Sequence, residues 1–125
     1  MTNTSHGQVL ILDDDENRHI EFDRILRGYK VIHVYSASEA INALQNSPPF
    51  DLISLDHDLG EFNNSHVYLD PGDGTEVAEF INLHLEHDRY PKRVMIHSWN
   101  PEGARRMEQL IREVKIPVRV KPFRS

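Results

Sequence analysis

The feature that most restricts the fold is a regular alternation of short apolar runs with helical stretches. The apolar runs lie at 8–12, 31–35, 52–55, 93–96 and 117–120, and helical apolar spacing follows the first four at 17–27, 38–47, 75–86 and 102–114. Runs this short, bounded by turn residues, are typical of buried strands. Four strand–helix repeats closed by a fifth strand predict a parallel sheet with helices on both faces.

Composition limits the kind of protein. The 125 residues fit one domain, 1–125, and the chain has no cysteine, so disulfides and thiolate metal sites are excluded. No stretch is long and apolar enough to span a membrane, and a cytoplasmic protein is expected. The formal charge of −6 argues against broad binding to nucleic-acid backbone. It permits a phosphorylated small molecule or nucleotide ligand held with a divalent cation.

The third apolar run is followed directly by three ionisable residues, Asp56, His57 and Asp58, and then by Leu59 and Gly60. Strand stability does not require Asp-His-Asp, because acidic residues fit pleated surfaces poorly and paired carboxylates repel. In an open α/β sheet, ligands bind at the carboxyl ends of the strands. These residues are therefore predicted to belong to a site.

Polar residues follow the other strands too, and the parallel arrangement predicts that they share one edge of the sheet. They are Asp13, Asp14 and Asp15, Ser36, His97, Ser98 and Asn100, and Lys121. Convergence of Asp13, Asp14 and Asp56 would destabilise the fold unless a hard cation neutralised them, and oxygen ligands suit Mg²⁺ or Mn²⁺. The alternative is that the aspartates at 13–15 only cap the first helix, a role that suits Asp15.

Two histidines, His57 and His97, end neighbouring strands beside the predicted metal. Imidazoles that titrate near neutral pH can act as base and acid in turn, as opening a cyclic phosphodiester requires. Alternatively, one of them only hydrogen-bonds a carboxylate or covers the metal. His66 is a weaker candidate. The remaining histidines are expected to be solvated surface residues; they include His6, His19, His33, His84 and His87.

Other candidates would contact a phosphate or a base. Lys121 offers a point charge, and Ser98 and Asn100 can hydrogen-bond phosphoryl oxygens, although Asn100 could instead cap the last helix. Trp99 could stack on a nucleobase, or it could pack against the lid formed by the following loop or against the core. The loop at 60–74 is unusually long, which favours a functional role as an active-site loop.

Taken together, these residues resemble the response-regulator receiver domain over nearly the whole chain. The resemblance implies a CheY-like, flavodoxin-like α/β/α fold with strand order 2-1-3-4-5. It places Asp13 and Asp14 at the magnesium-binding pair, Asp56 at the phospho-acceptor, and Asp58 where a backbone carbonyl binds the metal. Ser98 matches the switch Ser/Thr, and Lys121-Pro122-Phe123 matches the end of the fifth strand.

The departures point to a divergent branch. Receivers do not carry a histidine directly after the acceptor, their loop after the third strand is short, and they continue into a last helix, which is expected to be absent here because the sequence stops at Ser125. His57-Asp58-Leu59-Gly60, Gly72-Asp73-Gly74 and His97-Ser98-Trp99-Asn100-Pro101 resemble the cyclic-phosphate-processing receiver domain family.

Three functional hypotheses follow from this resemblance and from the residues. The first is a metal-dependent phosphoesterase that cleaves a 2′,3′-cyclic end or a cyclic nucleotide or oligonucleotide messenger. Histidine would activate water, or Asp56 would attack directly. The second is a stand-alone receiver phosphorylated on Asp56, and the third is a protein that sequesters a nucleotide. A small domain without an output module also suits phage or bacterial counter-defence.

Overall fold

The computed structural model of this chain describes residues 7–47, 49–56, 73–98 and 100–121. Its five strands are β1 (Gly7–Leu12), β2 (Tyr29–Val34), β3 (Leu52–Asp56), β4 (Val94–His97) and β5 (Val118–Val120). They form one sheet in the order β2-β1-β3-β4-β5, and every neighbouring pair is parallel. The predicted fold class and strand order are confirmed. All five carboxyl ends lie along one edge of the sheet.

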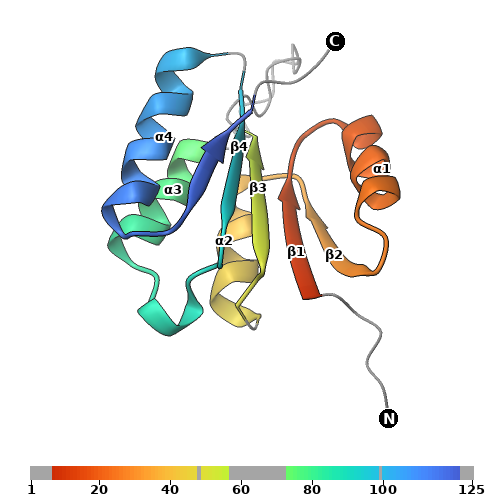
Figure 1. The fold of residues 1–125 in the computed structure, drawn as a ribbon, viewed down its shortest axis with the longest axis horizontal. Helices are drawn as coiled ribbons and strands as arrows, with labels where there is room; N and C mark the ends of the chain where they lie inside the picture. The colour runs from red at the N-terminus through yellow and green to blue at the C-terminus, as the bar shows by residue number, and fades with distance from the viewer. Residues whose placement is uncertain (1–6, 48, 57–72, 99, 122–125) are drawn as a thin grey trace.

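Four α-helices connect these strands: α1 (Glu16–Ile25), α2 (Ala37–Asn46), α3 (Gly74–Leu83) and α4 (Pro101–Glu113). A 3-10 turn, η1 (His87–Arg89), precedes β4. The helices α2, α3 and α4 cover one face of the sheet and α1 lies on the other (Figure 1). No helix follows β5 within the described residues, which end at Lys121. None of the helices in the described ranges has the length and apolar character to cross a lipid bilayer.

Each helix begins at a polar residue whose side chain accepts backbone N–H groups. Asp15, Ser36, Asp73 and Asn100 are the N-caps of α1 to α4. The helical stretch predicted from residue 38 begins earlier, at Ala37, because the Oγ of Ser36 accepts the N–H of Glu39 at 3.2 Å. The earlier start is favoured because Ser36 is extended and can therefore close the first turn.

The main core lies between the sheet and the three helices on its face. Alternate strand residues contribute to it because side chains of a strand point to opposite faces; these are Leu10, Leu12, Ile53, Leu55, Val94 and Ile96. The helices add Ala40, Leu44, Val77, Ala78, Ile81, Met107 and Ile111. Val9 and Ile11 are equally buried but lie outside this cluster, on the α1 side of the sheet.

The first helix buries only part of the apolar spacing predicted at 17–27. Phe22 and Leu26 are half-buried, whereas Ile20 and Ile25 are 54% and 64% exposed. The only α1 residue that is fully buried is His19, so the prediction that it is solvated was wrong. Hydrophobic spacing missed His19 because its burial depends on polar partners from outside α1. The predictions for His84 and His87 are confirmed, since both are exposed.

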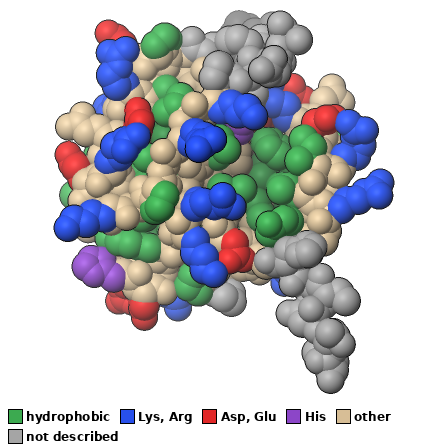
Figure 2. Space-filling view, viewed as in Figure 1, with side chains coloured by type: hydrophobic (Ala, Val, Ile, Leu, Met, Phe, Trp, Pro, Cys, Tyr) green, Lys and Arg blue, Asp and Glu red, His purple; other side chains and the backbone are tan. Residues whose placement is uncertain are grey.

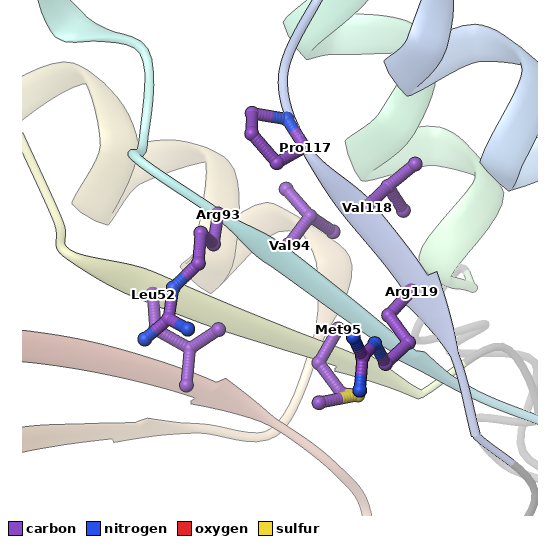
Figure 3. Close-up of a pocket in the computed structure, with 7 residues that line it drawn as sticks. All are labelled: Leu52, Arg93, Val94, Met95, Pro117, Val118 and Arg119. Atoms are coloured by element: carbon purple, nitrogen blue, oxygen red, sulfur yellow. The ribbon is translucent and has the colours of Figure 1, made fainter.

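On the side of the sheet where α1 lies, the strands β3, β4 and β5 are only partly covered by described residues. Hydrophobic side chains bordered by lysine and arginine gather there (Figure 2). A shallow pocket of about 380 Å³ is lined by Leu52, Arg93, Val94, Met95, Pro117, Val118 and Arg119 (Figure 3). These residues lie mainly toward the amino ends of β3, β4 and β5. The pocket is therefore separate from the strand ends that carry the predicted site.

Candidate active site

An acidic cluster lies at the carboxyl ends of β1 and β3. Asp13 directly follows β1, and Asp56 is the last residue of β3. One carboxylate oxygen from each of Asp13, Asp14 and Asp56 lies within 4.8 Å of the other two. The side chains of Asp13 and Asp56 are only 2% and 1% exposed. The fold therefore brings together three of the four predicted metal ligands, and Asp58 lies outside the described residues.

The electrostatics of this cluster suit a hard divalent cation. Burial raises the pKa of Asp13 above its ordinary value, and the hydrogen bonds from Arg18 and from the Asp15 backbone only partly oppose this. A cation coordinated by these oxygens would favour the ionised carboxylates and remove their mutual repulsion. Because the donor atoms are all oxygens, the cluster fits Mg²⁺ or Mn²⁺.

Asp13 is held at its carboxylate and at its backbone carbonyl. The Asp15 N–H donates to Oδ1 of Asp13 at 2.8 Å, while Asp15 itself caps α1 by accepting the N–H of Asn17 at 2.8 Å. The capping role predicted as an alternative for Asp15 is thus present. On the other side, Nε2 of the buried His19 hydrogen-bonds the Asp13 carbonyl at 2.9 Å. His19 also hydrogen-bonds His33, whose Nε2 bonds Asp23 at 2.9 Å.

Arg18 is a site residue that the sequence prediction missed. Its Nε donates to Oδ2 of Asp13 at 2.9 Å, and its terminal nitrogens lie 3.5 Å from Asp15 and 3.7 Å from Oδ2 of Asp56. Burial lowers the pKa of Arg18, but the attraction of Asp13, Asp56 and Asp15 outweighs it and the pKa is raised overall. A signal was present, because a cation in the first turn of a helix opposes the helix dipole.

His97 ends β4 as the register partner of Asp56 on β3. Burial lowers the pKa of His97 to about 4, the nearby charges of Lys121 and Arg18 lower it as well, and a hydrogen bond with the Lys121 backbone opposes them. Its ring also meets the edge of Phe22, with centroids 5.8 Å apart. The imidazole is therefore neutral at physiological pH, which is the form that can accept a proton.

The remaining predicted residues are placed as follows. Ser98 is buried, and its Oγ accepts the N–H of Asn100 at 2.8 Å. The side-chain oxygen of Asn100 caps α4 through the N–H groups of Glu102 and Gly103, the structural role weighed as an alternative. Lys121 follows β5 with an exposed side chain, and its backbone N–H bonds Ile96 at 2.8 Å. The substrate-binding roles of these three residues stay predictions. His57, Asp58, His66, Trp99 and most of the loop at 60–74 lie outside the described residues.

Gly74 allows α3 to start directly against the acidic cluster. A Cβ at this position would lie 2.8 Å from the carbonyl oxygen of Asp56 and 2.6 Å from the methyl group of Met107. The methionine can move aside, but the strand backbone cannot.

We expect Gly74→Ala to lower the free energy of unfolding by about 1–3 kcal/mol, measured by urea denaturation. Gly103→Ala, the same change near the start of α4, is the control, and an equal loss in both variants would contradict this explanation.

Comparison with known proteins agrees with the geometry. The family model of the cyclic-phosphate processing receiver domain matches residues 8–113. The comparison with curated proteins finds no match. Solved structures with the same fold include the response regulator TrrA from Thermotoga maritima in complex with Mg²⁺-BeF, which is 19% identical with a TM-score of 0.63. The match covers 93% of this chain and 87% of TrrA.

Two further receiver structures are similar as well. The CheY-like receiver domain protein from Methanospirillum hungatei is 21% identical, with 94% and 82% of the two chains covered and a TM-score of 0.60. The N-terminal domain of a receiver protein from Methanoculleus marisnigri is 24% identical, with 94% and 86% covered and a TM-score of 0.61. These likenesses establish the receiver fold. The family match spans most of the chain, and the protein belongs to the cyclic-phosphate processing receiver domain family.

Proposed function

We propose that this protein is a metal-dependent phosphoesterase that opens a cyclic phosphate. The substrate would be a 2′,3′-cyclic end or a cyclic nucleotide or oligonucleotide messenger. The observation that carries the proposal is the pairing of Asp56 with His97, which sets a neutral imidazole beside a buried acidic cluster. A receiver that only accepts a phosphoryl group on an aspartate does not need such a base. The family match supports the same substrate class.

The acidic residues would hold the cofactor. Asp13, Asp14 and Asp56 would bind Mg²⁺ or Mn²⁺, which when bound neutralises charge on phosphate oxygens. Asp13 is kept in position by His19 and by the Asp15 backbone, so its carboxylate is oriented before the cation arrives. Such preorganisation lowers the cost of assembling a site.

His97 would supply the proton chemistry. Its neutral ring takes a proton from a water molecule as that water attacks phosphorus, and one P–O bond of the ring breaks as the new P–O bond forms. The departing oxygen then receives a proton from the second imidazole, and proton exchange with water returns both rings to their starting forms; the products are a phosphomonoester and a free hydroxyl. Lys121 and Ser98 follow the neighbouring strands and are assigned to the phosphate oxygens. His57 is the second histidine assigned to this step, from its place in the sequence directly after Asp56.

Turnover with a panel of cyclic phosphates tests the proposal. The purified protein is incubated with cyclic mono-, di- and trinucleotides and 2′,3′-cyclic phosphates, with Mg²⁺, with Mn²⁺ or with EDTA, and products are separated by chromatography. We expect metal-dependent ring opening of one substrate class. Tight retention of a ligand without turnover would instead identify a sequestering protein. Acid-labile labelling of Asp56 by acetyl phosphate, without turnover, would identify a stand-alone receiver.

A further inference from the structure

We propose that Arg18 is an internal counter-ion that exchanges with the divalent cation of the acidic cluster and, once displaced, binds the phosphate of the ligand. This inference rests on the proposed function, because it assigns a regulator of cation binding within the same site. In its described position the guanidinium spans the cluster. Its three nitrogens face three different carboxylates, those of Asp13, Asp15 and Asp56.

The atoms contacted by Arg18 explain why the exchange is competitive. Oδ1 of Asp13 accepts the Asp15 N–H, so Oδ2 is the oxygen turned toward Arg18, at 2.9 Å from Nε. Oδ2 of Asp56, whose side chain is buried, faces Nη2 at 3.7 Å. These two residues also belong to the predicted cation site. A guanidinium against both carboxylates compensates the charge that a divalent cation would otherwise neutralise.

The side chain of Arg18 is able to move out of the cluster. It is 27% exposed, whereas its partners Asp13 and Asp56 are buried, so it reaches the cluster from the solvent side. Its flexible stem starts in the first turn of α1, where the helix dipole disfavours a cation unless an anion is near. Once a cation takes over the carboxylates, the guanidinium loses its anionic partners. The phosphate of a bound ligand then offers a bidentate replacement.

Binding measurements on the full chain test this exchange without relying on turnover. The metal-free parent, Arg18→Met and Arg24→Met are titrated with Mg²⁺ by calorimetry, and each is then titrated with inorganic phosphate in saturating Mg²⁺. Arg24→Met is the matched control, because Arg24 lies on the same helix and pairs with Glu21 at the surface. Circular dichroism and urea unfolding check that each variant folds. Arg18→Lys, which keeps a cation, provides a second variant.

We expect Arg18→Met to bind Mg²⁺ roughly tenfold more tightly than the parent and phosphate roughly tenfold more weakly. Arg24→Met should change neither, and Arg18→Lys should fall between. Unchanged or weaker Mg²⁺ binding by Arg18→Met would overturn the exchange, since Arg18 would then only support the shape of the cluster. If the parent and Arg18→Met bound phosphate equally, or if neither bound it, the proposed binding of phosphate by the displaced Arg18 would be overturned. Absence of turnover with the exchange intact would count against the phosphoesterase alone.

Discussion

Asp56→Asn is expected to lower phosphoesterase turnover by roughly three orders of magnitude, because it removes a ligand of the cation that stabilises charge on the phosphate. Asparagine has nearly the same shape, so the buried end of β3 is retained. The effect on stability should depend on the cation. Mg²⁺ at 100 times its dissociation constant would stabilise the parent by about 2.7 kcal/mol, and this gain should nearly vanish in the variant. Without metal, the variant should be at least as stable as the parent, because one buried negative charge is removed.

Thermal unfolding with Mg²⁺ and with EDTA measures both effects. Asp51→Asn is the control: Asp51 precedes β3 at its opposite end, where its carboxylate bonds the N–H of Gln8 at 2.8 Å and pairs with Lys92 at 3.2 Å. That variant should keep the full response to Mg²⁺. A normal Mg²⁺ response in Asp56→Asn would show that the cation does not bind at the end of β3. It would also remove the metal from the proposed mechanism.

The edge of the sheet that carries the site could be predicted without a structure. Five apolar runs separated by helical stretches allow few arrangements, and in a parallel sheet all carboxyl ends meet at the same edge. Asp13, Asp56 and His97 therefore had to lie close together once their strands were recognised. Like charges at such an edge predict a cation, and the structure brings these carboxylates within 4.8 Å of one another.

What the pattern could not predict depends on contacts between side chains of different elements. His19 looked like one more polar residue of α1, but it is buried because the Asp13 carbonyl and His33 satisfy its ring nitrogens. On the same helix Ile20 and Ile25 face solvent, while His19 is buried. Arg18 was overlooked for the same reason, since its partners are distributed over the β1 end and β3. Hydrophobic periodicity carries no information on such polar pairings.

His97→Gln is expected to change both stability and activity, in different pH ranges. The pKa of His97 is about 4 in the folded protein because of burial, against about 6.5 in an unfolded chain. Between these values the unfolded chain binds a proton that the folded protein does not, so His97 makes the fold lose stability as the pH falls from 6.5 to 4. Glutamine does not titrate. Over this range the free energy of unfolding of the variant should therefore fall less than that of the parent, and the difference between the two should be at most roughly 3 kcal/mol. Urea unfolding at several pH values measures both.

The same residue sets an expectation for turnover. If neutral His97 is the base, kcat/KM of the parent should stay high down to about pH 4 and then fall, since this profile reports the pKa of the free enzyme. His97→Gln should lower kcat by roughly 10²- to 10⁴-fold at neutral pH.

His87→Gln, at an exposed histidine in η1, is the control and should leave both profiles unchanged. An acid limb near pH 6.5 that persists in His97→Gln would assign the base to another histidine. The only predicted candidate at the end of β3 would then be His57, because it directly follows Asp56 in the sequence.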